Sequence, residues 1–171
     1  GLESLLPMNL DSLDLSGTDV GDDGLLYLMQ LDSFKSLSLS YTRITDKGFP
    51  VLETLSSLQS LSLVRTRVTD KAIGTVAAFE GLRELSLNYT DVGDDGLALL
   101  ADLHELRSLS LDSANVSTEG AATIVQFENL KDLNLYHTLV DQAGYDTIRQ
   151  ALPSCEIVWD AKSASPMRRR S

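Results

Sequence analysis

Apolar residues recur along this chain at a fixed spacing of 24 residues. Each recurrence begins the same short pattern, apolar-x-x-Leu-x-Leu, with mostly polar residues between the apolar ones. The pattern begins at Leu10, Phe34, Leu58, Leu82, Leu106 and Leu130. Leucines two residues apart point to the same face of a β-strand, because side chains alternate between the two faces. The pattern therefore predicts one short parallel strand in each repeat, with its leucines directed into a shared core.

Further columns keep the same phase. A threonine follows three residues after the last leucine in every copy except one, where Ala114 takes its place. An aliphatic residue and then a small residue come next, the small column being Gly24, Gly48, Ala72, Gly96, Gly120 and Gly144. A fixed period of this length indicates a solenoid, because one unit cannot bury its apolar face without a neighbour. The threonine hydroxyls are expected to turn inward and bond the backbone of a tight turn.

A short helix is predicted after each strand, on the convex side. Apolar residues there follow helical spacing, in the sets Leu25, Leu28 and Leu31; Phe49, Leu52 and Leu55; Ile73, Val76 and Phe79; and Ala121, Ile124 and Phe127. Residues of N-cap type precede these sets at Asp22, Asp46, Asp70, Asp94 and Thr118. We therefore expect these residues to cap the helices.

These columns resemble the leucine-rich repeat family over residues 2 to 160. The segment Ile44-Thr45-Asp46-Lys47-Gly48 is similar to bacterial-type 24-residue repeats related to the cysteine-containing, F-box-associated subclass, with threonine where that subclass has cysteine. The resemblance implies a right-handed αβ solenoid, a horseshoe arc with a parallel concave sheet and short convex helices. Nothing like an F-box precedes the repeats, so the resemblance does not imply a ubiquitin-ligase role.

The ends of the chain depart from the repeat. We expect residues 1–9 to be the remnant of a preceding turn or a partial cap, 10–153 to form six repeats, 154–161 a capping strand, and 162–171 a basic disordered tail. A longer helix is expected from Asp141 to Leu152, ended by Pro153, and Trp159 can cover the last coil. Because the chain starts with Gly1, either it has been processed or trimmed, or a missing segment covers Leu13 and Leu15.

Charge and cysteine content narrow the function classes. Residues 1–161 hold all 25 acidic side chains but only 10 of the 14 basic ones, a net charge of −15, which should repel nucleic acid and anionic membranes. No apolar run approaches the roughly 18 residues of a membrane span, so a soluble protein is expected. The lone Cys155 permits no intrachain disulfide and favours a reducing, cytoplasmic compartment. We expect a monomer unless an open N-terminal end pairs with another chain.

The candidate chemical groups do not assemble into a catalytic or metal site in this fold. Cys155 begins the seventh strand and His137 ends the sixth, too far apart for a nucleophile–base pair, and His104 has no partner for a triad. The pairs Asp22-Asp23 and Asp94-Asp95 lie three repeats apart, and neither alone has the ligands for calcium. The sequence predicts no enzyme, no metal and no cofactor.

Large side chains gather where the strands end. The concave columns are mostly serine, which a crowded inner curve explains better than a serine recognition ladder. The candidate protein-binding residues, named here the strand-end surface, are Tyr41, Arg43, Val64, Arg65, Arg67, Tyr89, Asp112, Tyr136 and His137. Tyrosine and arginine often anchor interfaces, but Arg65 could equally stack between Tyr41 and Tyr89 as an internal cation–π ladder.

A second candidate surface is a basic rim before the strands, formed by Lys35, Arg83, Arg107 and Lys131. A solvated rim paired with nearby acids is the favoured interpretation. The sequence as a whole predicts a non-catalytic module that binds a protein partner on the concave sheet and strand-end surface. The alternative is a structural spacer, or a fragment of a longer array or multidomain protein, whose N-terminal end packs on a neighbouring domain.

Overall fold

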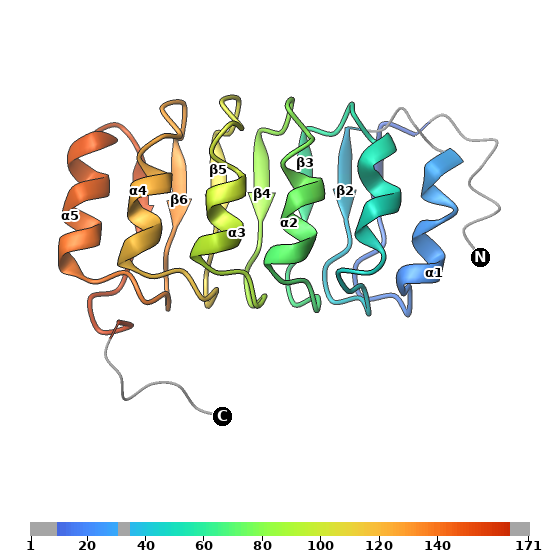
Figure 1. Ribbon diagram of the computed structural model, residues 1–171, viewed down its shortest axis with the longest axis horizontal. Coiled ribbons are helices and arrows are strands. Elements are labelled where there is room, and N and C mark those ends of the chain that lie inside the picture. The colour runs from blue at the N-terminus through green and yellow to red at the C-terminus, as the bar shows by residue number, and fades with distance from the viewer. Residues whose placement is uncertain (1–9, 31–34, 165–171) are drawn as a thin grey trace.

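A computed structural model describes residues 10–30 and 35–164, which form one open parallel sheet lined on one side by short helices (Figure 1). The sheet has seven strands in chain order. They are β1 (Ser12–Asp14), β2 (Ser36–Ser38), β3 (Ser60–Ser62), β4 (Glu84–Ser86), β5 (Ser108–Ser110), β6 (Asp132–Asn134) and β7 (Glu156–Val158). Equivalent residues of successive repeats lie opposite one another, as Leu37 lies between Leu13 and Leu61. The predicted parallel sheet is confirmed, without a register slip.

The helices stand in a row on the other side of the strands (Figure 1). The α-helices are α1 (Asp22–Leu25), α2 (Asp70–Val76), α3 (Asp94–Leu99), α4 (Ala121–Ile124) and α5 (Gln142–Ala151). Tighter 3₁₀ turns complete the convex side as η2 (Leu28–Gln30), η3 (Phe49–Thr54) and η4 (Thr118–Gly120). The second repeat has only the 3₁₀ helix η3, with Pro50 in its first turn. The convex layer is thus less regular than the sheet it covers.

The core lies between these two layers and runs through every described repeat. The strand leucines are buried, and so are the predicted inward residues of the helices, including Phe49, Phe79 and Phe127. Burying a large aliphatic or aromatic side chain stabilises the fold by about 1.5–3 kcal/mol. The predicted core is therefore confirmed where the structure describes it, while Leu31 and Phe34 lie outside the described residues.

Threonine hydroxyls close the turn after five of the strands, as predicted. The hydroxyls of Thr18, Thr42, Thr66, Thr90 and Thr138 donate to the carbonyl three residues earlier, at 2.6–2.8 Å. Thr138, for example, donates to the Leu135 carbonyl and is fully buried. Ala114, which replaces threonine in the fifth repeat, is also buried and leaves no hydroxyl to satisfy.

The prediction that the aspartates cap their own helices is wrong. Asp70 and Asp94 are the first residues of α2 and α3, and the N-cap positions belong to Thr69 and Gly93. In the fifth repeat the cap is Ser117, whose side chain accepts from the Glu119 amide, and not Thr118. The aspartate side chains point instead toward the next repeat.

Each of these aspartates accepts hydrogen bonds from the residue 23 positions later. Asp22 accepts from the amide and hydroxyl of Thr45 at 2.8 and 2.7 Å, and Asp46 accepts the equivalent pair from Thr69. Asp70 accepts from the Gly93 amide at 2.7 Å, and Asp94 accepts from the amide and hydroxyl of Ser117. We call this series the aspartate ladder. It joins neighbouring repeats on the convex side with charge-assisted hydrogen bonds, which are stronger than neutral ones.

The aspartate ladder also explains three glycines in the column of small residues. A Cβ atom on Gly96 would lie 2.3 Å from Asp70 Oδ1, and one on Gly120 would lie 2.5 Å from Asp94 Oδ1. At Gly48 the distance to Asp22 Oδ1 would be 2.7 Å. At these three positions the carboxylate of one repeat therefore occupies the space that a side chain would fill in the next.

At the C-terminal end, α5 is the longest helix and ends before Pro153, as expected. Its N-cap Asp141 accepts from the Gly144 amide at 2.9 Å. Trp159 stacks on Tyr145 with ring centroids 4.4 Å apart, and its indole N–H donates to the Val140 carbonyl at 2.9 Å. Trp159 thus packs against the last coil. The predictions for residues 1–9 and for the end of the tail from 165 lie outside the described residues.

Candidate protein-binding surface

The turns that follow the strands share an uncommon backbone conformation. Gly17, Tyr41, Arg65, Tyr89, Ser113 and His137 all have positive φ, between 54° and 69°. This left-handed region favours glycine, and a bulky residue pays a steric cost there. Four of the candidate residues therefore sit at strained positions. Such strain persists only where the surroundings hold it, and it often accompanies functional sites.

Backbone hydrogen bonds between repeats hold these turns in place. The Tyr41 amide donates to the Val64 carbonyl at 2.7 Å, and the Arg65 amide donates to the Asn88 carbonyl at 2.9 Å. The Tyr89 amide continues the series by donating to the Asp112 carbonyl at 2.8 Å. The turn positions are thus fixed by main-chain groups, independently of the side chains that they carry.

The structure brings Tyr41, Arg65 and Tyr89 together. The Arg65 guanidinium lies 4.5 Å from the centre of the Tyr89 ring and 5.8 Å from that of Tyr41. Both rings nevertheless remain open to solvent, with 58% of Tyr41 and 43% of Tyr89 exposed. The contacts of a cation–π ladder are therefore present, and they leave about half of the aromatic surface accessible.

Beside this row lie three more of the predicted residues. Arg43 is exposed and forms an ion pair with Asp19 of the preceding repeat, at 2.9 Å. Arg67 is also exposed, whereas Val64 is half-buried in the turn that follows β3. Arginine is thus prominent along this edge of a strongly acidic chain.

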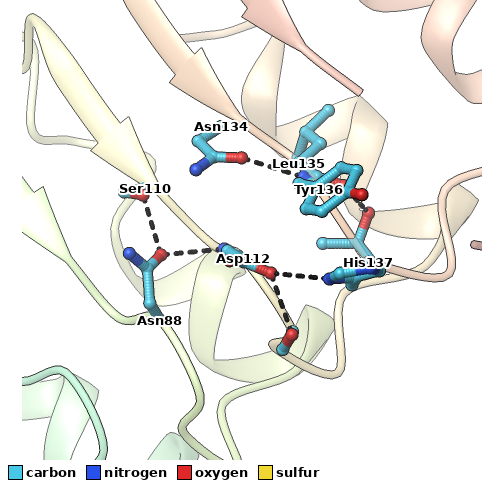
Figure 2. A network of polar contacts seen from close by, with 9 residues as sticks. Asn88, Ser110, Asp112, Asn134, Leu135, Tyr136 and His137 are labelled. Atoms are coloured by element: carbon cyan, nitrogen blue, oxygen red, sulfur yellow. Dashed lines mark hydrogen bonds and ion pairs between the residues drawn. The ribbon is translucent and has the colours of Figure 1, made fainter. Parts of the chain in front are cut away.

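The remaining predicted residues belong to a polar network at the ends of β5 and β6 (Figure 2). Asn88 Oδ1 accepts from the Ser110 hydroxyl at 2.7 Å and from the Asp112 amide at 2.8 Å. Asp112 Oδ1 in turn accepts from the Ser113 hydroxyl at 2.8 Å and lies 3.3 Å from His137 Nδ1. This network links three adjacent repeats and fixes the Asp112 carboxylate.

Tyr136 and His137 form the outer part of the same region. Their ring centroids are 3.8 Å apart, and both side chains are exposed. The Tyr136 amide is held by Asn134 Oδ1 at 2.9 Å (Figure 2). The strand-end surface therefore comprises two groups, one around Arg65 and one around Asp112.

Sequence reasoning missed the residues that support this surface. Asn88, Ser110 and Ser113 were not among the predicted site residues, although they hold Asp112 in place. A signal was available, because Asn88 and Asp112 stand one repeat apart at a strand end, where polar side chains can reach each other. The left-handed turns had no comparable signal, since only Gly17 in that column is a residue type that favours them.

The concave serines bond to one another. The hydroxyls of Ser16 and Ser38 are 2.6 Å apart, those of Ser38 and Ser40 are 3.2 Å apart, and those of Ser40 and Ser62 are 2.7 Å apart. Hydrogen bonds among neighbouring strands use up donors that a ligand would need. This part of the sheet fits the predicted explanation of small, packed polar side chains.

The groups with chemical reactivity are placed unfavourably for reaction. Cys155 is buried, and desolvation, followed by the nearby Asp132 charge, raises the pKa of its thiol. Ser113 and His137 both bond to the Asp112 carboxylate, so the hydroxyl is not presented to the imidazole as a nucleophile to its base. Within the described residues, no three histidine, cysteine or acidic side chains gather as metal ligands. No helix in that part of the chain is long and apolar enough to cross a membrane.

Comparison with known proteins identifies the repeat. A model of the leucine-rich repeat family matches residues 7–29, 32–49 and 82–101. The structure is similar to that of internalin C2 from Listeria monocytogenes, with a TM-score of 0.71 and 24% identity over 94% of this chain. A further internalin from that species has a TM-score of 0.67 at 18% identity over 92% of this chain. A leucine-rich repeat protein of Leptospira interrogans also has a TM-score of 0.67, at 25% identity over 91%.

These likenesses concern the fold, because the identities are low and the chain spans only part of each structure. It covers 66% of internalin C2, 50% of the other internalin and 38% of the Leptospira protein. No curated protein sequence gives a significant match. The 24-residue columns, the parallel sheet with its convex helices, and the family match agree with one another. This chain has the leucine-rich repeat fold, an open solenoid of seven parallel strands in one sheet with short helices.

Proposed function

We propose that this chain is a non-catalytic module that binds a protein partner on its concave sheet and strand-end surface. The observation that carries the proposal is the row of Tyr41, Arg65 and Tyr89. These side chains are large, contact one another and remain exposed, although their backbone positions are costly for non-glycine residues. Tyrosine and arginine are also the side chains that most often carry binding energy at protein interfaces.

Preorganisation supports the same proposal. Ordering loops and side chains opposes binding, and a surface already held in place avoids part of that cost. Here the main chain of each turn is hydrogen-bonded to the next repeat, and Arg65 is placed between the two rings. A partner would meet a rigid surface with an aromatic group at one end and the Asp112 network at the other.

The test is affinity capture from lysate of the source cells, comparing the wild-type chain with a triple variant, Tyr41→Asn, Arg65→Asn, Tyr89→Asn. Asparagine removes the large side chains, yet among non-glycine residues it is one of those best suited to a left-handed turn. A matched control is Leu26→Ala, Lys71→Ala, Leu99→Ala, which removes two exposed apolar side chains and one cation on the helical side. All chains are first compared by circular dichroism and thermal melting.

We expect a protein that is captured by the wild type and the control variant but lost by the triple variant. Its affinity is then measured with the purified components. Capture of the same proteins by all three chains would contradict the proposal and favour the structural-spacer alternative. Loss of thermal stability in the triple variant without loss of binding would assign the row to an internal ladder.

A further inference from the structure

A groove runs along the edge of the sheet where the strands begin, opposite to the strand-end surface. The first residues of the strands and the residues before them line it: Lys35, Ser36, Gln59, Ser60, Arg83, Glu84, Arg107, Ser108, Lys131 and Asp132. Lys35, Gln59, Arg83, Arg107 and Lys131 occupy equivalent positions in successive repeats. The groove therefore follows the long axis of the solenoid across β2 to β6.

The cations of this groove lack acidic partners among the described residues. The ion pairs among the described residues are Arg43 with Asp19 and His137 with Asp112, and neither includes a residue of the groove. The paired rim expected from the sequence is thus not seen. The lining also holds two acidic side chains, Glu84 at its centre and Asp132 at one end, and Glu84 accepts instead from the Ser60 hydroxyl at 3.0 Å. Four exposed cations remain available in a chain whose first 161 residues carry a net charge of −15.

The backbone holds the cations at regular intervals. The Arg107 amide donates to the Arg83 carbonyl at 2.8 Å, and the Lys131 amide donates to the Arg107 carbonyl at 2.7 Å. Adjacent parallel strands lie about 4.8 Å apart, so Arg83, Arg107 and Lys131 form a straight row on three neighbouring strands. Such a row presents several donors to a chain of carboxylates laid across the strands.

We propose that this groove binds an extended acidic segment of a protein partner. A short run of carboxylates can meet the cations of the groove while the rest of the partner avoids the acidic body. A long polyanion such as nucleic acid carries its charge along its whole length and is repelled by that body. The proposal rests on the proposed function in protein binding but uses the opposite edge of the sheet, so the two can fail separately.

The probe is a fluorescein-labelled peptide of alternating glutamate and serine, and binding is followed by fluorescence anisotropy at low and then rising ionic strength. The same peptide with glutamine in place of glutamate is the reference. The groove variant is Arg83→Gln with Arg107→Gln. Its matched control is Lys47→Gln with Lys71→Gln, which removes the same charge from two exposed positions on the helical side.

We expect the glutamate peptide to bind the wild-type chain, more weakly as salt is raised, and the glutamine peptide not to bind. The groove variant should bind about five- to tenfold more weakly, while the control keeps more of the wild-type affinity. Glu84→Gln should tighten binding about two- to threefold, a gain that misfolding cannot produce.

Three outcomes would overturn the proposal. They are no binding of the glutamate peptide at low ionic strength, equal losses in the groove and control variants, and tighter binding of a single-stranded oligonucleotide or a heparin fragment than of the peptide. None of these results bears on capture through Tyr41, Arg65 and Tyr89.

Discussion

At the scale of single residues, space beside the aspartate ladder decides which positions accept a side chain. Gly96 lies against Asp70, whose Oδ1 is already bonded to the Gly93 amide. Gly74, in the same part of the chain, has open space where a Cβ would be added. The two glycines therefore differ in surroundings although both lie in short helices.

We predict opposite effects of alanine at these glycines. Gly96→Ala should lower the free energy of unfolding by about 1–2 kcal/mol, because Asp70 must move and leave the Gly93 amide. Gly74→Ala should raise it by about 0.5–1 kcal/mol, since alanine favours a helix over glycine. Urea denaturation of both variants measures the difference. Equal changes would show that Asp70 can move at no cost.

The sequence predicted the leucine and threonine positions well but not the role of the aspartates. An aspartate before an apolar helical pattern has the same local sequence whether it caps its own helix or bonds to the next repeat. Only the position of Thr45, a whole repeat away from Asp22, distinguishes the two. Local sequence propensity was therefore insufficient to predict what the aspartate side chains bond to. The same holds for the turns at Tyr41 and His137, where the repeat imposes a conformation that these residue types do not favour.

At the scale of elements, the strands depend on their neighbours, whereas α5 begins with a cap of its own. Hydrogen bonds from the Gly144 amide, and then from Thr118, hold the pKa of Asp141 below its ordinary value of 3.8. A lowered pKa means that the folded state favours the charged carboxylate. That contribution to stability is fully present above the ordinary value and is lost as the pH falls through the lowered one.

We predict that Asp141→Asn makes the stability of the chain less sensitive to acid. Asparagine also caps helices, so the melting temperature near neutral pH should fall only slightly. The difference between wild type and variant should shrink as the pH falls through the pKa of Asp141. Thermal melts of both chains across the acidic range provide the measurement. A difference that does not vary with pH would mean that the carboxylate charge contributes nothing to the cap.

At the scale of the whole molecule, stability is a sum over repeats and over the interfaces between them. The sheet, the core and the aspartate ladder all connect neighbouring repeats. The ladder does so with few atoms. Its bonds are the part of an interface that one substitution can remove without opening a cavity in the core. They therefore allow the coupling between two repeats to be measured.

We predict that Asp94→Ala destabilises the chain by about 1.5–3 kcal/mol, because it leaves the Ser117 amide and hydroxyl without their charged acceptor. The control is the exposed neighbour Asp95→Ala, expected to change stability by less than about 0.5 kcal/mol. Chemical denaturation gives both values, and hydrogen exchange should show lost protection at Ser117. If the two variants lose the same stability, the ladder does not couple the repeats.

The distribution of charge also belongs to this scale. The sequence shows a strongly acidic chain, but the fold places Arg43, Arg65 and Arg67 at one edge of the sheet and Arg83, Arg107 and Lys131 at the other. The repeat spacing alone predicted which of these cations occupy equivalent positions in successive repeats. The sequence could not show that the cations of the second edge lack acidic partners among the described residues. Side-chain positions were needed for this, because rim carboxylates such as Glu105 can point in several directions.

The order of the strands has a mechanical consequence. β1 and β7 lie at opposite ends of the sheet, and the hydrogen bonds between strands run along the line that joins them. Tension applied along this line breaks the hydrogen bonds of one interface between repeats at a time. Each repeat that peels away frees 24 residues, which extend to about 80 Å in place of roughly 4.8 Å in the folded stack. The chain should therefore lengthen in steps under low force and behave as an extensible tether rather than a stiff rod.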